Sequence, residues 1–314
     1  MKIDLEFAKK LLLERDNFNI FLHASPDGDT VGSGFALCTA LRRLGKKANV
    51  LCSDEIPKSY SFITDGYEPW DFEPETLVSV DVADAKLLGK YEQKGSEILL
   101  SVDHHGLNRE FAKYTFVDAS AAANCENTLK LLKAINVEID SYIAACIYTG
   151  ISTDTGCFKY SNTSPESHIM AAEMMDYGID FSEINRIMFD TKTRGRMKIE
   201  GRLMEQMKFF FDGKAAFIAV TEQMKKDAGV SDDDLEGITS MPRKVEGVLV
   251  GVTFREKENG VFKISVRTHA PVDAAEICRK FGGGGHNRAA GCAVEGMTLE
   301  QAEKEFVRVI GEVL

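Results

Sequence analysis

The chain has 314 residues, 44% of them hydrophobic, so it can build a sizeable core and is long enough for two domains. Its formal net charge of −11 argues against broad binding to duplex DNA, since such binding requires a strongly cationic face. No stretch approaches the roughly 20 apolar residues that span a bilayer, and seven scattered cysteines without a CxxC pair indicate reduced thiols, so we expect no membrane partner and a cytoplasmic protein.

The first half of the chain alternates strand-like and helix-like segments, the pattern of a parallel sheet with helical crossovers. Apolar, β-rich runs predict strands at residues 18–22, 48–52, 77–81, 98–102 and 114–117. Apolar residues at helical spacing predict helices at residues 32–44, 124–135, 139–150 and 165–177. This half is therefore expected to fold as an α/β domain.

The second half has a different pattern of predicted helices and strands. A helical segment of mixed charge at residues 181–211 is followed by strand-like runs, with a turn at residues 258–260, and by two helices around a glycine cluster. The predicted strands are residues 215–220, 245–254 and 261–267, and the helices are residues 273–281 and 298–313. We predict a first domain at residues 1–185, a helical linker at 186–212 and a second domain at 213–314, with a cleft between the domains.

Aspartate and histidine residues gather in four clusters, of which the first three directly follow predicted strands. The clusters are His23, Asp27 and Asp29; Asp81; Asp103, His104 and His105; and Asp154. The carboxyl ends of parallel strands share one edge, where open α/β sheets bind ligands. Carboxylates and imidazoles without thiolates suit a pair of hard or borderline divalent ions such as Mn²⁺. The sequence thus predicts a two-metal hydrolase.

The same residues also have simpler explanations. Residues 26–29 can form an ordinary turn before a helix that is capped near Asp29, and a strand-end aspartate such as Asp81 is often a helix cap. Asp84 is the better cap for the helix that follows Asp81, which leaves Asp81 for another role. The small residues at 32–34 would let a phosphate approach the helix amino terminus, which favours a site.

The glycine cluster is a second candidate site. Four glycines at residues 282–285 remove every Cβ, so that backbone N–H groups can approach an anion, while His286 and Arg288 add charge or hydrogen bonds. The neighbouring predicted strand carries Ser265 and Arg267, and an arginine can bind a phosphate through two hydrogen bonds. The alternative is a flexible loop.

Taken together, these motifs resemble the DHH phosphoesterase superfamily, in the branch with a DHH-associated carboxyl-terminal domain whose stand-alone members are nanoRNases and 3′-phosphoadenosine-5′-phosphate (pAp) phosphatases. The resemblance implies a Rossmann-like first domain, a smaller mixed α/β second domain and two Mn²⁺ ions. It implies that one ion is held by His23, Asp27 and Asp81, and the other by Asp29, Asp81, His104 and Asp154. It also implies that His105 faces the scissile phosphate and that Asp103 supports it.

The resemblance assigns substrate binding to the second domain. The residues concerned are Ser265, Arg267, Gly283, Gly284, Gly285, His286 and Arg288, which would hold a distal phosphate or a terminal nucleotide. Relatives tend to carry a small hydroxyl residue shortly before the glutamate that corresponds to Glu126, whereas this chain has Asn124 in that segment. Its amide can still donate a hydrogen bond to phosphate.

The resemblance implies hydrolysis of oligoribonucleotides of about two to five nucleotides, and dephosphorylation of pAp. Residues and resemblance together predict that two metal ions activate the attacking water. One alternative is a cyclic di-AMP or linear dinucleotide phosphodiesterase. Another is a manganese pyrophosphatase, against which the nucleotide-like glycine motif argues. A non-catalytic nucleotide sensor is a third, although a sensor does not need a complete set of metal ligands. A homodimer is also possible.

Overall fold

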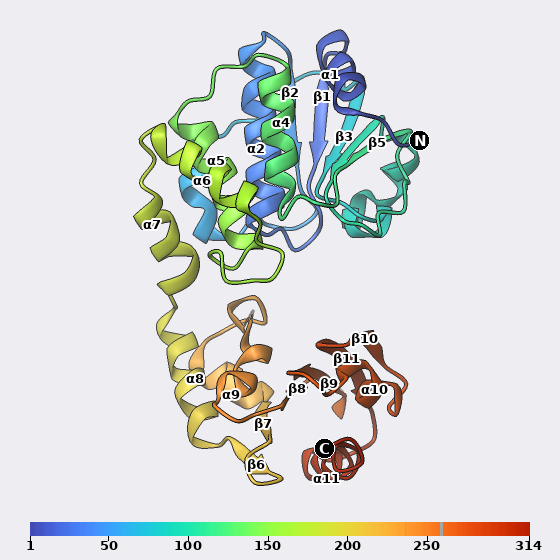
Figure 1. Ribbon diagram of the computed structural model, residues 1–314, viewed down its shortest axis with the longest axis vertical. Coiled ribbons are helices and arrows are strands. Elements are labelled where there is room, and N and C mark those ends of the chain that lie inside the picture. The colour runs from blue at the N-terminus through green and yellow to red at the C-terminus, as the bar shows by residue number, and fades with distance from the viewer. Residues whose placement is uncertain (236, 258–259) are drawn as a thin grey trace. The chain divides into compact units, whose positions relative to one another are not determined.

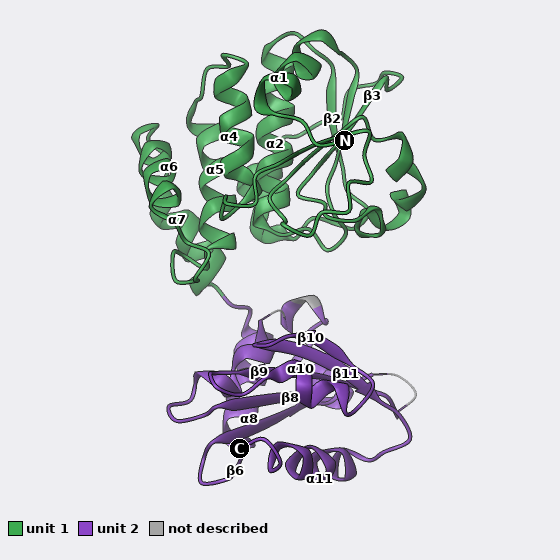
Figure 2. Cartoon of the chain, turned by 45° about the vertical axis from the view of Figure 1, so that its right-hand side comes forward, with its two compact units in different colours: residues 1–191 green, residues 192–314 purple. Residues whose placement is uncertain are grey.

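The computed structural model describes residues 1–235, 237–257 and 260–314 (Figure 1). The chain divides into two compact units, Met1–Thr191 and Lys192–Leu314, each with its own hydrophobic core (Figure 2). The turn predicted at residues 258–260 includes Glu258 and Asn259, which lie outside the described residues.

Unit 1 contains a five-stranded sheet, sheet A, with the strand order β2-β1-β3-β4-β5 and parallel pairing throughout. Its strands are β1 (Phe18–Phe21), β2 (Ala48–Leu51), β3 (Thr76–Val80), β4 (Leu100–Asp103) and β5 (Tyr114–Val117). Runs rich in Val, Ile and Phe form these strands because both faces of a parallel sheet are buried. The predicted parallel α/β architecture is confirmed, with β4 beginning at Leu100 rather than at Ile98.

Helices cover sheet A: α2 and α4 lie against it, and α5 packs on α2 and α4 (Figure 1). The longer helices are α1 (Leu5–Glu14), α2 (Gly28–Arg43), α4 (Asn124–Ala134), α5 (Ser141–Asp154) and α6 (Pro165–Asp176). The remaining helical segments are η1 (Lys58–Tyr60), α3 (Ser61–Thr64), η2 (Ala85–Glu97), which is interrupted at Gly89, α7 (Phe181–Asn185) and η3 (Arg186–Asp190). Asp84 caps η2 by accepting from the Lys86 N–H, as its position suggested.

Helix α2 begins one turn earlier than predicted because Asp27, rather than Asp29, caps it and accepts from two backbone N–H groups. The small residues that follow have a packing role. A Cβ at Gly32 would lie 2.3 Å from the carbonyl oxygen of Cys146 in α5, and one at Gly34 would lie 2.4 Å from the Leu22 side chain. The prediction that residues 32–34 admit a phosphate is therefore wrong, since this side of α2 faces the core.

Unit 2 contains a six-stranded mixed sheet, sheet B, with the order β10-β11-β9-β8-β7-β6, in which β7 and β8 are parallel and the other pairs antiparallel. Its strands are β6 (Lys208–Phe210), β7 (Ala215–Val220), β8 (Val250–Glu256), β9 (Phe262–Thr268), β10 (Gly284–His286) and β11 (Ala289–Val294). Part of the glycine cluster thus forms an edge strand, although the sequence predicted no strand there.

The two faces of sheet B differ in chemistry. One face packs the side chains of Val250, Val252 and Phe254 against α10 (Ala274–Arg279) and α11 (Leu299–Ile310). Over β8, β9, β10 and β11 the opposite face carries small and polar residues, which cross-strand pairing places on the same side. We call it the polar face of sheet B; it comprises Gly251, Thr253, Arg255, Lys263, Ser265, Arg267, Gly284, His286, Ala289, Gly291 and Ala293.

Helical segments cover β7 and part of β8 and β9 on that same side. They are α8 (Arg194–Glu205), α9 (Glu222–Ala228), η4 (Asp233–Leu235), η5 (Ile238–Ser240) and η6 (Pro242–Lys244). Ile199 and Leu203 of α8 pack with Ile218 and Val220 of β7. The part of the predicted linker that follows Thr191 is therefore packed into unit 2.

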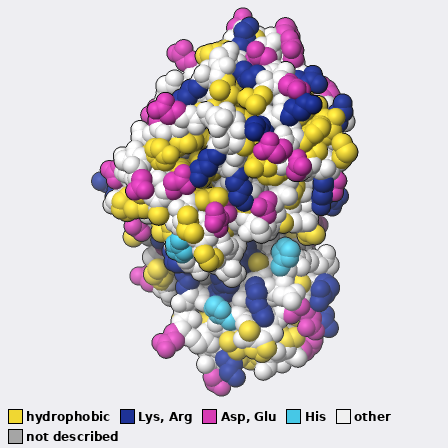
Figure 3. Space-filling view, turned by 45° about the horizontal axis from the view of Figure 1, so that its top comes forward, with side chains coloured by type: hydrophobic (Ala, Val, Ile, Leu, Met, Phe, Trp, Pro, Cys, Tyr) yellow, Lys and Arg dark blue, Asp and Glu magenta, His cyan; other side chains and the backbone are white. Residues whose placement is uncertain are grey.

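The surface is mixed in charge. On the face shown in Figure 3, lysine and arginine side chains are interspersed with aspartate and glutamate. Neighbouring charges form local pairs, such as Lys133 Nζ with Glu173 Oε2 at 2.6 Å. Within the described ranges, no helix has the length and apolar character needed to cross a membrane.

Candidate functional site

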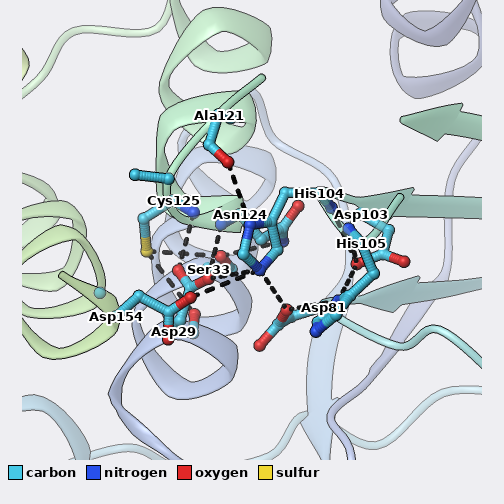
Figure 4. A network of polar contacts seen from close by, with 12 residues as sticks. Asp29, Ser33, Asp81, Asp103, His104, His105, Ala121, Asn124, Cys125 and Asp154 are labelled. Atoms are coloured by element: carbon cyan, nitrogen blue, oxygen red, sulfur yellow. Dashed lines mark hydrogen bonds and ion pairs between the residues drawn. The ribbon is translucent and has the colours of Figure 1, made fainter. Parts of the chain in front are cut away.

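Predicted metal ligands gather at the carboxyl edge of sheet A. His23 follows β1, Asp81 follows β3, and Asp103 ends β4 immediately before His104 and His105. Parallel strands end at the same edge, so these side chains converge there. Two helix ends complete the group, with Asp27 and Asp29 at the start of α2 and Asp154 at the end of α5 (Figure 4).

One set of ligand atoms surrounds His23. Its Nε2 lies 3.5 Å from Asp27 Oδ1 and 3.6 Å from Asp81 Oδ2. Its Nδ1 lies 2.8 Å from the carbonyl oxygen of Ala24. A protonated Nδ1 can donate a hydrogen bond to this oxygen, which leaves Nε2 as the ligand atom. The three side chains thus offer ligand atoms that all lie within 4.8 Å of one another.

A second set surrounds His104. Its Nε2 lies 3.4 Å from Asp154 Oδ2, 3.5 Å from Asp81 Oδ1 and 3.8 Å from Asp29 Oδ2. Its Nδ1 is 3.2 Å from the carbonyl oxygen of Ala121, again leaving Nε2 directed at the carboxylates (Figure 4). Asp81 therefore presents one carboxylate oxygen to each set, as a bridging ligand would.

Asp81 itself is held in an unusual state. Its backbone is left-handed, with φ of +59°, and its side chain is only 3% exposed. Its Oδ1 has no hydrogen-bond partner, although a buried carboxylate oxygen without a donor is costly. A donor set of four carboxylates and two imidazoles, with one buried oxygen unpaired, fits a pair of divalent cations.

The pKa values of these groups reflect the negative charge that the fold concentrates here. Burial and the charge of Asp27 raise the pKa of Asp29 to about 7. Burial and the charges of Asp29 and Asp27 raise the pKa of Asp154 to about 8. Burial lowers the pKa of His23, but the hydrogen bonds and charges of Asp27 and Asp81 outweigh it and raise that pKa to about 11. Protons therefore occupy the metal-free site.

Asp103 and His105 form a separate hydrogen-bonded pair. His105 Nδ1 lies 2.8 Å from Asp103 Oδ1, and Asn108 Nδ2 donates to Asp103 Oδ2 at 2.5 Å. Burial raises the pKa of Asp103, but the hydrogen bonds from His105 and Asn108 outweigh it and lower that pKa. The hydrogen bond to Asp103 raises the pKa of His105. His105 also comes within 3.6 Å of Asp81 Oδ1, yet its Nδ1 is engaged by Asp103.

Asn124 lies behind the metal-ligand cluster. Its backbone N–H donates to Asp29 Oδ2 at 2.5 Å, and the Cys125 N–H donates to Asp29 Oδ1 at 2.8 Å, so the start of α4 holds this carboxylate. The Asn124 side chain is fully buried, and its Nδ2 donates to Ser33 Oγ at 3.0 Å (Figure 4). The structure thus corrects the expectation that this amide contacts phosphate, because the amide is turned away from solvent.

Two supporting residues were missed in the sequence. Asn108 donates to Asp103 Oδ2 and to the Val82 carbonyl, and Asn127 donates to the Asp103 carbonyl at 3.0 Å. The position of Asn108, five residues after Asp103 in a turn, could have indicated it. For Asn127 on α4 the sequence carries no such signal.

The predicted substrate-binding residues of unit 2 lie on three neighbouring strands. Register places His286 opposite Ala289 and Ala289 opposite Arg267, so both charged side chains share the polar face of sheet B. Ser265 is on the same face, opposite Gly291, which is opposite Gly284. The Arg267 guanidinium donates to the Val266 carbonyl at 3.1 Å.

Three further predicted residues have evident structural contacts or backbone constraints. A Cβ at Gly283 would lie 2.2 Å from the Gly291 carbonyl oxygen, and Gly285 has φ of +144°, so both positions need glycine for the backbone geometry. Arg288 donates through NH1 to the Val272 carbonyl at 2.5 Å. This bond connects Arg288 to the segment before α10, and the role of Arg288 in substrate binding stays a prediction.

Comparison with known proteins follows this division of the chain. Residues 17–151 match the DHH family, N-terminal domain, and residues 212–314 match the DHHA1 domain. A bifunctional oligoribonuclease and PAP phosphatase NrnA from Thermus thermophilus is 34% identical over 301 residues, covering 94% of this chain and 89% of that protein. The protein of the same name from Bacillus subtilis is 24% identical over 284 residues, covering 89% and 90%.

Solved structures share the fold. An exopolyphosphatase-related protein from Bacteroides fragilis superposes with a TM-score of 0.87 at 24% identity, covering 98% of this chain and 95% of that one. RecJ from Thermus thermophilus, crystallised with Mn²⁺, has a TM-score of 0.58 at 16% identity and covers 99% of this chain and 55% of that one. With both domain matches and the Thermus NrnA likeness, the chain belongs to the DHH family and carries a DHHA1 domain.

Proposed function

We propose that this chain is a metal-dependent phosphoesterase that hydrolyses short oligoribonucleotides to mononucleotides and dephosphorylates pAp. The observation that carries the proposal is the pair of ligand sets that share Asp81, whose buried Oδ1 has no other partner. The printed activities of the NrnA relatives, which align along most of the chain, supply the substrate class.

The two ions would be held by the ligand sets around His23 and His104. When bound, they would lower the pKa of a water molecule and polarise the phosphate. We propose Mn²⁺ because imidazole ligands favour it over Mg²⁺, and because a DHH-fold neighbour, RecJ, was crystallised with Mn²⁺. RecJ was also crystallised with Mg²⁺, so both metals belong in the assay.

His105 is proposed to contact the scissile phosphate. Asp103 accepts from its Nδ1, which keeps a proton there and leaves Nε2 for a ligand. The Asp103 hydrogen bond raises the pKa of His105, so the imidazole can donate a hydrogen bond to a phosphate oxygen that gains charge during reaction. About half of the His105 side chain is exposed, so a substrate can reach it.

In unit 2, Arg267, Ser265 and the segment from Gly283 to His286 are proposed to hold the distal phosphate or terminal nucleotide. Arg267, Ser265 and His286 share the polar face of sheet B, which supports this assignment. A cytoplasmic location is also proposed, supported by seven free cysteine thiols.

The test is turnover of a 5′-phosphorylated RNA dinucleotide by the full-length chain in Mn²⁺, in Mg²⁺ and in excess chelator. Parallel reactions contain pAp, cyclic di-AMP and pyrophosphate. We expect metal-dependent release of mononucleotides from the dinucleotide and of phosphate from pAp. Turnover of pyrophosphate alone would replace the proposal with a pyrophosphatase, and tight nucleotide binding without any turnover would replace it with a sensor.

A further inference from the structure

Three arginine side chains gather on one side of sheet B without a carboxylate partner. Arg243 lies in η6, Arg255 in β8 and Arg267 in β9, and each is partly exposed. Across the described parts of the chain none of the three forms an ion pair, and the guanidinium bonds of Arg267 go to backbone carbonyls. Some other arginines of this unit have carboxylate partners, as Arg202 has Asp227 at 3.2 Å.

Backbone geometry brings these arginines together. Arg267 is directly opposite Gly251, and a Cβ at Gly251 would lie 2.8 Å from the Arg243 nitrogen. The absence of that Cβ lets Arg243 lie directly beside Arg267. Arg255 is on the same face of β8 as Gly251, since it is four residues further along the strand. Burial and the charges of Arg243 and then Arg255 lower the pKa of Arg267.

Unpaired hydrogen-bonding atoms lie on the same face. Thr253 is fully buried between Gly251 and Arg255 in β8, and its Oγ1 has no hydrogen-bond partner. Arg255 Nε is also buried and unpartnered. Thr253 is directly opposite Ser265, which places two hydroxyl groups side by side. Buried polar atoms without partners are rare in folded proteins, so two on one face next to unpaired cations indicate a missing anionic ligand.

We propose that the polar face of sheet B has a second phosphate position, formed by Arg243, Arg255 and the hydroxyls of Thr253 and Ser265. The first position, at Arg267 and His286, belongs to the proposed function on which this inference rests. The ligand is a nucleotide end that carries two phosphate groups beyond the bond to be cleaved. The second phosphate comes either from the next phosphodiester of a strand or from a 5′-diphosphate.

The physical reason is charge balance. Three guanidinium groups at close range repel one another and lose part of their hydration, which destabilises the free protein. Phosphate oxygens would accept charge-assisted hydrogen bonds from them and from the hydroxyls. A single phosphate cannot neutralise three cations, whereas two phosphates can.

The test is equilibrium binding to the full-length chain in excess chelator, which prevents hydrolysis. The probes are AMP, with one phosphate, ADP, with a diphosphate, and the RNA trinucleotide pApApA, which carries two phosphates beyond the bond to be cleaved. The variants are Arg255→Gln and Arg243→Gln. The matched control is Arg279→Gln, which removes the same charge from an exposed position of α10, on the opposite side of the sheet.

The wild type should bind ADP or pApApA more tightly than AMP, and whichever gains more identifies the source of the second phosphate. Arg255→Gln and Arg243→Gln should each weaken that tighter binding about tenfold, as loss of a charged hydrogen bond does, while AMP binding and the control stay within about twofold. Equal weakening of all probes, or no weakening, overturns the inference. Because the binding assay needs no turnover, its result can be interpreted even if the phosphoesterase assay shows no activity.

Thermal unfolding supplies a second readout. Thr253→Val keeps the side-chain shape and removes the unpartnered hydroxyl, and Arg255→Gln removes repulsion, so both variants should melt at or above the wild-type temperature. Weaker binding of the two-phosphate probe by a variant of undiminished stability supports a ligand site. Variants that melt lower and bind normally would show that these residues serve the fold, and would overturn the inference.

Discussion

Two regions of this chain concentrate charge of opposite sign, and in neither does the described protein neutralise it. The edge of sheet A brings four carboxylates around His23 and His104, with Asp81 Oδ1 unpaired. The polar face of sheet B gathers arginines without a carboxylate. By contrast, Glu200 accepts from Lys192 at 2.8 Å and from Arg196 at 2.6 Å, a network that needs no ligand. The difference teaches that unpaired charge, rather than charge itself, indicates where ligands bind.

The largest effect is expected at Asp81, which belongs to both ligand sets. Asp81→Asn keeps the side-chain size and tolerates the left-handed backbone, but it removes the negative charge between the ions. We expect turnover of the dinucleotide to fall by about a thousandfold or more, with loss of bound metal measured by elemental analysis. Asp71→Asn, at an exposed position of the same unit, is the control. Near-normal activity in Asp81→Asn would contradict the view that the unpaired carboxylates of sheet A bind catalytic metal ions.

The cationic region on the polar face of sheet B is tested by substitution of Arg267. Arg267→Gln should raise the KM for a 5′-phosphorylated dinucleotide by about tenfold or more, because a charge-assisted hydrogen bond to the distal phosphate is lost. Hydrolysis of a small artificial phosphodiester without a distal phosphate should change little. Steady-state kinetics on both substrates measure how much more the substitution affects the dinucleotide than the small phosphodiester. Equal losses on the two substrates would mean that Arg267 does not act through a distal phosphate.

Removal of metal should make stability depend on pH. The pKa values of Asp29 and Asp154 are raised from 3.8 to about 7 and about 8, and that of His23 from 6.5 to about 11. The folded metal-free chain therefore retains protons that the unfolded chain loses, so the unfolding free energy falls as pH rises through these values. Between about pH 6 and about pH 8 we expect a loss on the order of 5 kcal/mol, or roughly 10 to 20 °C in Tm.

Addition of Mn²⁺ should reverse this loss, and its stabilising effect should grow with pH because protons compete with the cation for the same carboxylates. Differential scanning calorimetry with chelator and with Mn²⁺ measures both slopes. A metal-free Tm that rises with pH over this range would contradict the raised pKa values.

The smallest effect is expected at Asn124, which distinguishes support of the metal site from contact with the substrate. Asn124→Ala removes the hydrogen bond to Ser33 beside Asp29 but keeps the backbone N–H that holds Asp29. We expect the Mn²⁺ concentration for half-maximal activity to rise about three- to tenfold, with the KM for dinucleotide unchanged. A raised KM at saturating Mn²⁺ would return Asn124 to the substrate-binding role predicted from the sequence.

The sequence was most informative where structure is local. Strand and helix periods in the first half located the parallel sheet, and the placement of Asp81 and of residues 103–105 after predicted strands brought them to one edge. It was least informative where one side of an element had to be chosen. Residues 32–34 were expected to admit a phosphate and instead pack against Cys146, Asn124 and Leu22, and the glycine cluster, for which no strand was predicted, provides β10.

By itself the sequence determined which chemical groups are present and, through the alternation of strands and helices, that most candidate ligands meet at one sheet edge. Only the tertiary structure decided that Asp81 offers one oxygen to each ligand set, that Asn124 supports Asp29, and that Arg243 and Arg255 join Arg267. The bond between Asn124 and Asp29 connects residues 95 positions apart, and the arginine cluster depends on strand register. Such contacts follow from register and packing, in which a slip of one residue moves a side chain to the opposite face, so no local pattern contains them.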